Sequence, residues 1–194
     1  MFKNPFTARN IPFIAVLMSI EIILQFLGNY IAFGPVSINL SLVPIALGAI
    51  LYGPWGGLLL GLINALFVLM APSTMVFYDV SVIGTLVTVL VKIMTAGFVS
   101  GVIYHLLKNK NRLLATIIAA ILIPIINTGL FVAGSFIFFR PFLESGASEA
   151  GVNVVYFLFI GMIGWNFIFE VSTTAILIYP LFRVSDYYRV KFAA

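Results

Sequence analysis

Three ionisable side chains, Glu21, Lys92 and Glu170, lie inside long apolar stretches of this sequence. If those stretches cross a membrane, a charged group at mid-depth costs about 2.5–3.5 kcal/mol on insertion scales, so it usually faces a protein interior or a water-filled cavity. A lysine ammonium in such a place can hold an anion by charge-assisted hydrogen bonds, and a carboxylate can pair with it. The chemistry that these residues indicate is therefore binding of a polar solute.

Neutral polar residues accompany the three charges at spacings of three or four. Residues spaced in this way share one face of a helix. They are Gln25 and Asn29 beside Glu21, Thr85, Thr88 and Thr95 beside Lys92, and Asn166 beside Glu170, with Asn64, Asn127 and Thr128 on other apolar stretches. The pattern predicts a helical bundle that lines a hydrophilic pocket.

Several of these residues are candidates for binding the solute. From the polar faces we select Lys92, Thr88, Asn127, Asn166, Gln25 and Asn29, and from the aromatic residues Trp165 and Tyr78. A pocket for a small molecule usually combines apolar walls with a few placed polar groups. Two alternatives stay open: the neutral residues can be interhelical hydrogen bonds worth about 0.6 kcal/mol each, and Lys92 can form an ion pair with Glu21.

The composition determines which elements position these residues. Of 194 residues 62% are apolar and 8% are charged, whereas a soluble domain has roughly 25% charged residues. A spanning helix needs about 20 apolar residues, so we predict an all-α integral membrane protein, one domain covering 1–194, with six transmembrane helices. The expected spans are 11–31, 40–51, 55–71, 82–107, 113–139 and 152–182, the second being short and interrupted by Pro44, and the first a retained span rather than a signal peptide.

Basic residues are unevenly distributed among the connections between these spans. Six spans with an internal N-terminus place Lys3, Arg9, Lys108, Lys110, Arg112, Arg183, Arg189 and Lys191 on one side, and Arg140 with Asp79, Glu144 and Glu149 on the other. Cytoplasmic loops retain Lys and Arg, so we expect both termini to be cytoplasmic. This bias explains most of the net charge of +4 without a nucleic-acid partner, although a polybasic lipid-binding patch is an alternative use of the 108–112 residues.

Motifs for catalysis are missing. The sequence has no cysteine, no G-x-x-x-x-G-K-[ST] phosphate loop and one histidine, His105, at the expected cytoplasmic end of the fourth span. We therefore expect neither an enzyme nor a metal site nor a cofactor. Secondary transporters usually need more spans than six and internal repeats, so the chain is expected to pair with itself or to take energy from other subunits.

One segment resembles a known family. The residues from Ile38 to Ala49, followed by Leu51-Tyr52-Gly53-Pro54 and Gly57, are similar to the second-span region of the substrate-binding S components of bacterial energy-coupling-factor (ECF) vitamin transporters. The resemblance implies a multi-pass protein of the bacterial cell membrane that binds one vitamin at high affinity from outside. It also implies partners, namely a transmembrane coupling protein and two ATPase subunits that hydrolyse ATP.

The resemblance adds two expectations about residues. In that family the loop after the first span contributes to the vitamin site, which adds Asn39 to the candidates. Members that share a coupling module carry an A-x-x-x-A pattern on the first span, where this sequence has Ala15-x-x-x-Ser19. These two residues are therefore the expected docking position, with serine as a departure from the pattern.

Within the family, the stretch from Asn39 to Ile45 and the segment Ala71-Pro72-Ser73-Thr74 look most like the pantothenate branch. Lys92 could then hold the carboxylate while polar neighbours bind the remaining groups. Folate, riboflavin and hydroxymethylpyrimidine stay open as other vitamins. A stand-alone channel or facilitator and a structural membrane subunit without ligand are alternatives from other functional classes.

Overall fold

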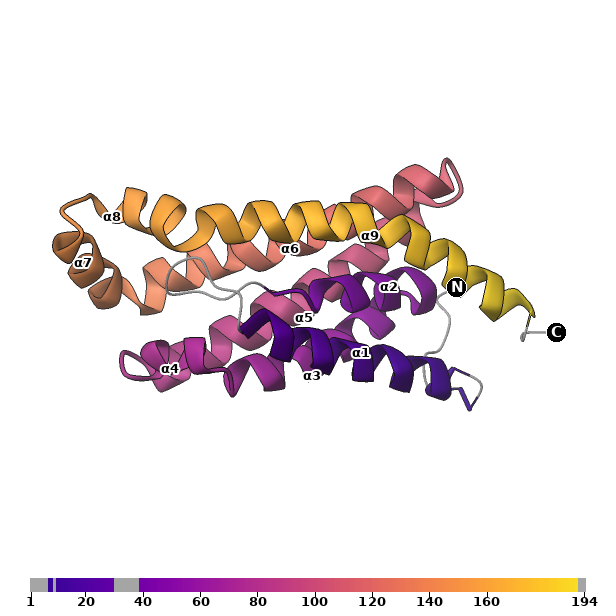
Figure 1. Cartoon of the computed structure of the whole chain (residues 1–194), viewed down its shortest axis with the longest axis horizontal. Helices are drawn as coiled ribbons and strands as arrows, with labels where there is room; N and C mark the ends of the chain where they lie inside the picture. Colours follow the sequence, from indigo (N-terminus) through magenta and orange to yellow (C-terminus); the bar gives the residue numbers. More distant parts are fainter. Residues whose placement is uncertain (1–6, 9, 30–38, 192–194) are drawn as a thin grey trace.

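Helices make up all the regular secondary structure in the described residues, which are 7–8, 10–29 and 39–191 of this computed structural model. Figure 1 shows an elongated bundle whose long helices run roughly side by side. The elements are α1 (Ile11–Asn29), α2 (Leu42–Tyr52), α3 (Pro54–Leu69), α4 (Pro72–Tyr78), α5 (Val82–Leu107), α6 (Arg112–Phe138), α7 (Arg140–Glu149), α8 (Val154–Tyr156), the π-helix η1 (Phe157–Ile163) and α9 (Gly164–Lys191).

Four helical segments are long and apolar enough to cross a membrane: α1, α5, α6 and the continuous run from α8 to Arg183. Helices α3 and α4 form a further candidate, bent by 76° where Pro72 begins α4. Large apolar side chains cover the outside of the bundle, and Ile83, Ile137 and Ile176 are each at least 70% exposed. Such a surface is unsuited to water and suited to lipid, which agrees with an all-α membrane protein.

Helix α2 is the centre of the bundle. All eleven of its residues are buried, and it contacts α1, α3, α5, α6 and α9. Eleven residues rise only about 16 Å, so α2 alone is too short to cross a bilayer. The structure thus supports four or five spans. The expected second span, which contains α2, stays a prediction, because the segment before α2 includes residues outside the described part.

Glycines on α3 and α5 allow these two helices to pack with their backbones in contact. A Cβ atom on Gly57 would collide with the carbonyl oxygen of Gly97, and one on Gly101 would lie 2.6 Å from the nitrogen of Pro54. Between α2 and α3 the chain reverses at Gly53, whose φ of 81° is a conformation that glycine adopts readily. The close approach positions α5, and with it Lys92, against the centre of the bundle.

Three elements differ from the sequence-based expectation of loops and plain helix. Residues 72–78 and 140–149 form the short helices α4 and α7, each with proline in its first turn, where the missing N–H costs nothing. In α7 the guanidinium of Arg140 pairs with Glu144 at 2.8 Å. The expected sixth span contains a seven-residue π-helix before α9.

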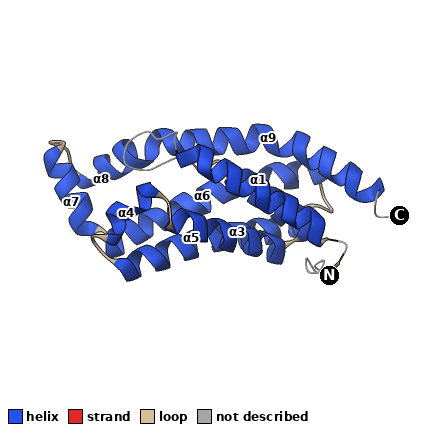
Figure 2. Cartoon of the chain, turned by 60° about the horizontal axis from the view of Figure 1, so that its bottom comes forward, coloured by secondary structure: helices blue, strands red, loops and turns tan. Residues whose placement is uncertain are grey.

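Both views place the start of α1 and the end of α9 at the same end of the bundle as the α5–α6 turn (Figures 1 and 2). Lys108, Lys110 and Arg112 lie at that turn, whereas α4 and α7 lie at the opposite end. The structure therefore groups the described basic residues as the charge pattern predicts. Lys3 and Arg9 lie outside the described residues, and the side of the membrane on which this end lies stays a prediction.

The close contact of α3 and α5 yields a stability prediction. Gly57→Ala forces the two backbones apart, and overpacking of this kind costs about 1–3 kcal/mol, so we expect a lower melting temperature in detergent. Gly129→Ala on α6 is the matched control, because a Cβ there meets no atom within 4 Å and alanine favours the helix by up to about 1 kcal/mol. Equal melting temperatures for both variants would contradict this packing.

Candidate functional site

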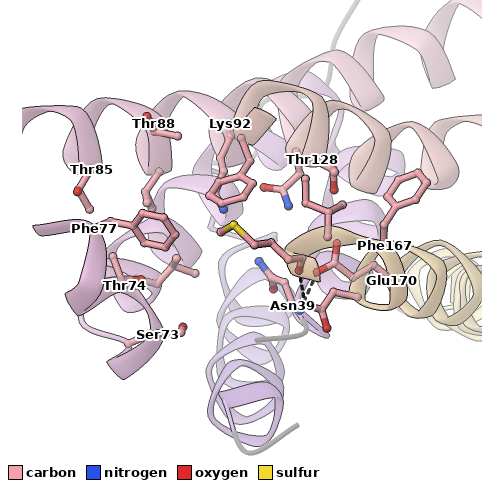
Figure 3. A pocket seen from close by; sticks show the side chains of 18 of the residues that line it. Asn39, Ser73, Thr74, Phe77, Thr85, Thr88, Lys92, Thr128, Phe167 and Glu170 are labelled. Carbon is pink, nitrogen blue, oxygen red and sulfur yellow. Dashed lines mark hydrogen bonds between the residues drawn. The ribbon is translucent and has the colours of Figure 1, made fainter. Parts of the chain in front are cut away.

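A cavity lies among α1, α5, α6, η1, α9 and the α3–α4 bend, with Asn39 from the segment before α2. Its atom-free space is about 780 Å³, a volume that includes the space at its open mouth. Polar side chains from five helices and the Asn39 segment line it together with apolar ones (Figure 3). The polar lining residues are Gln25, Asn39, Ser73, Thr74, Thr85, Thr88, Lys92, Asn127, Thr128, Asn166 and Glu170.

Lys92 and Glu170 are the two charged residues among the described residues that line this cavity. Lys92 comes from α5, and its Nζ lies 4.9 Å from the centre of the Phe131 ring on α6, a cation–π contact. Glu170 comes from α9, and its Oε1 accepts a hydrogen bond of 2.9 Å from the backbone N–H of Asn39. Figure 3 shows the two side chains on different sides of the open space.

The acid that acts electrostatically on Lys92 is Glu170. In the described part of the chain the two groups form no direct ion pair. The ammonium group therefore retains hydrogen-bond donors for a ligand. The alternative pairing of Lys92 with Glu21 is not present: Glu21 is 1% exposed, and neither of its carboxyl oxygens has a hydrogen-bond partner among the described atoms.

A buried hydrogen-bond network fixes the wall of the cavity on the α1 side. Asn64 of α3 donates to Gln25 Oε1 at 3.2 Å and also donates to the Ser41 hydroxyl. The amide of Asn39 donates to Asn64 Oδ1 at 3.2 Å. Ser41 hydrogen-bonds with Gln25 at 3.1 Å and with Asn39. Together with the bond from Asn39 to Glu170, the network ties the start of α2 to α1, α3 and α9.

Two cavity atoms lack partners within the part of the chain that the structure describes. They are Thr88 Oγ1 and Asn127 Oδ1, both buried. Buried polar atoms in native proteins are nearly always hydrogen-bonded, so an exception needs an explanation. A hydroxyl can donate or accept and a carbonyl oxygen can accept, so each of these two atoms can take a further hydrogen bond.

Aromatic side chains form the apolar wall toward α4 and α7. The Phe77 ring packs against Phe131 and Phe139, with centroids 5.7 and 4.9 Å apart, and all three line the cavity. The bend at Pro72 brings Phe77 into this position, because it turns α4 across the end of the bundle. The cavity thus offers both apolar surface and separated charges.

The structure brings together six of the nine predicted site residues. Lys92, Thr88, Asn127, Asn166, Asn39 and Gln25 all line the cavity.

Of the other three residues, Trp165 and Tyr78 lie elsewhere. Trp165 is 62% exposed on the outside of α9, because neighbouring helix residues point about 100° apart and Asn166 points inward. Tyr78 donates to the carbonyl of Leu69 at 3.1 Å, which braces the α3–α4 bend. Asn29 ends α1, and its side chain lies outside the described part.

Glu170 is the charged lining residue that the sequence prediction missed, and Ser73, Thr74, Thr85 and Thr128 are the neutral polar ones. Glu170 lines the cavity one helical turn from Asn166 on α9. The spacing of four between Asn166 and Glu170 was the signal that could have identified it.

The fold and the cavity define a helical protein with an apolar outer surface and a cavity lined by polar side chains. A family model for the substrate-specific component of ECF transporters matches residues 9–182. The chain therefore belongs to this family, whose members are membrane-embedded transport subunits that act with an ECF module and a small-molecule substrate rather than as enzymes. No curated protein and no solved structure matches the chain.

The network at Asn64 leads to a prediction about stability. Asn64→Leu removes hydrogen bonds to Gln25, Asn39 and Ser41 at a position that is 0% exposed, and unsatisfied buried groups cost about 1–3 kcal/mol each. We expect a clear fall in the melting temperature in detergent. Ser19→Ala is the control, since the Ser19 hydroxyl bonds only the Ala15 carbonyl of its own helix on an exposed face, and it should change stability little. If both variants melt alike, the network does not hold this wall together.

Proposed function

We propose that this S component binds a small monoanionic vitamin, with pantothenate as the best candidate, and delivers it to an ECF module in a bacterial cell membrane. The observation that carries the proposal is Lys92, the cation of the described cavity lining, which has no direct ion pair there. An ammonium in a low-dielectric site binds a carboxylate strongly through charge-assisted hydrogen bonds.

The remaining groups of pantothenate suit the cavity chemically. Its hydroxyls and amide can bond Thr88 Oγ1 and Asn127 Oδ1, which have no other partner among the described atoms. Its geminal methyl groups need apolar contact, which Phe131 and Met162 offer. Folate, riboflavin and hydroxymethylpyrimidine are the competing vitamins, and thermal-shift screening of the purified protein against all four separates them.

The topology belongs to the same proposal. We infer six spans, with α2 and the residues before it as the second, and both termini in the cytoplasm. The grouping of Lys108, Lys110 and Arg112 at the end where α1 starts supports this orientation, because cytoplasmic loops retain basic residues. The cavity then lies toward the outer side, since it borders α4 and the end of α6 that is remote from those residues. A stand-alone channel is the alternative, and solute flux through liposomes that contain this chain alone would favour it.

The role of Lys92 is testable by removing its charge. Lys92→Met keeps the length of the side chain, and loss of one partner from a buried charged pair costs about 2–5 kcal/mol, so pantothenate affinity should fall by about 100-fold or more. Lys110→Met at the exposed α5–α6 turn is the matched control and should bind normally. Equilibrium binding to protein purified in detergent measures both, with the melting temperature reporting the fold. Unchanged affinity in a folded Lys92→Met protein would rule out the carboxylate role.

The docking position on α1 is a second part of the proposal. Ala15 and Ser19 are exposed on the outer face of α1 and one turn apart, and small residues let another helix approach closely. We propose that the transmembrane coupling protein docks there and that two ATPase subunits supply the energy.

A bulky residue at this position should separate docking from binding. Ala15→Trp is expected to abolish co-purification with a co-expressed ECF module while leaving the vitamin affinity within about twofold, because position 15 lies outside the cavity. Ile176→Trp, at a 70% exposed position of α9, is the control and should retain the module. Normal co-purification of Ala15→Trp would place the docking surface elsewhere.

A further inference from the structure

Glu170 is the one acidic residue among the described residues that line the cavity, and it is not needed to explain binding of a carboxylate at Lys92. Its side chain is 6% exposed and comes from α9, while Lys92 comes from α5. Its Oε1 accepts a hydrogen bond of 2.9 Å from the backbone N–H of Asn39, and a carboxylate can accept several hydrogen bonds through its two oxygens. Figure 3 shows the group at the edge of the open space, joined to Asn39.

A buried carboxylate and a half-buried ammonium that line one cavity impose a direction on any charged ligand. The ligand's own carboxylate is drawn to Lys92 and repelled by Glu170, and both effects are strong in a site with little water. The end of the ligand that faces Glu170 must then be uncharged or positive, and hydrogen-bond donors there are favoured. A second negative charge at that end would lie against an acid, which discriminates against dianions.

We propose that Glu170 is a specificity-determining residue that accepts hydrogen bonds from the hydroxyl end of the ligand and restricts the site to monoanions. This inference rests on the proposed function and extends it from the carboxylate end of the ligand to the opposite end. The ligand class is an elongated monocarboxylate with hydroxyl donors remote from the acid group. A site that hydrogen-bonds a substrate hydroxyl rejects analogues that lack it far more strongly than an apolar pocket does.

The bond from Asn39 to Glu170 allows a clean substitution. Glu170→Gln retains a carbonyl oxygen that can accept the Asn39 N–H, and it removes the negative charge and one acceptor oxygen. The start of α2 therefore stays tied to α9 in this variant. Glu144→Gln is the matched control, because Glu144 is an exposed acid on α7 that pairs with Arg140 at 2.8 Å.

Three probes distinguish the two ends of the ligand. Pantothenate has both the carboxylate and the hydroxyls, N-(3,3-dimethylbutanoyl)-β-alanine is the same skeleton without either hydroxyl, and 4′-phosphopantothenate carries additional negative charge at the hydroxyl end. Equilibrium dissociation constants are measured for the full-length wild type, Glu170→Gln and Glu144→Gln in detergent, and melting temperatures report the fold.

The wild type should bind pantothenate at least about tenfold more tightly than either analogue, because hydrogen bonds to charged groups contribute about 1.5–3 kcal/mol. Glu170→Gln removes the same repulsion from the carboxylates of both monoanions, so it should weaken pantothenate binding by about tenfold relative to the dihydroxyl-free analogue. The variant should bind 4′-phosphopantothenate more tightly than the wild type does. Glu144→Gln should match the wild type for all three probes.

The outcomes separate this inference from the proposed function. If the wild type binds none of the probes, the proposed function fails and the inference fails with it. If the wild type binds pantothenate but Glu170→Gln weakens both monoanions by the same factor, the proposed function stands and Glu170 acts only through Asn39, which overturns the inference. If Glu170→Gln does not fold, the affinities of the wild type test the inference instead. Equal affinity of the wild type for pantothenate and for the dihydroxyl-free analogue would overturn the inference.

Discussion

The ammonium group of Lys92 in an apolar bundle is the constraint on which the rest of the site depends. A charge at this depth is tolerated only where protein groups or a ligand replace water, and the described chain offers it the Phe131 ring and, at a distance, Glu170. Both come from other helices, α6 and α9. The arrangement of these helices is therefore tied to one charged side chain.

Close packing on the opposite side of α5 makes this arrangement possible. The glycines of α3 and α5 let the two backbones touch, and the fully buried α2 fills the centre of the bundle. The cavity lies in the described part of the bundle where polar side chains from several helices gather. The cavity and its hydrogen-bond network thus occupy the part of the bundle that apolar packing leaves open.

Much of this could be predicted from helical spacing. The stripe of Thr85, Thr88 and Lys92 and the spacing of Glu21 and Gln25 identified faces that the structure turns inward. The spacing could not say which acid faces Lys92, because that depends on how far α9 is displaced along the bundle relative to α5. Trp165 was selected as a binding residue because it is next to Asn166 in the sequence. Its own position on the helix puts it on the outer face of α9 instead.

Element boundaries were less predictable than element faces. Helices α4 and α7 lie in segments that look like loops, since their polarity and prolines are typical of turns, yet proline in the first turn of a helix is compatible with it. Helix α2 begins only at Leu42. Asn39 and Ser41 precede it, and their side chains belong to the buried hydrogen-bond network. Such tertiary hydrogen bonds have no local signature in the sequence.

We propose that the cavity around Lys92 holds a small monocarboxylate. Native mass spectrometry of the chain purified in detergent from cells grown with the B vitamins tests it most directly, with the released molecule identified by its mass. We expect one bound pantothenate per chain, and none in Lys92→Met purified in parallel. A wild-type chain that carries a cationic or uncharged vitamin, or a Lys92→Met chain that retains its ligand fully, would contradict it.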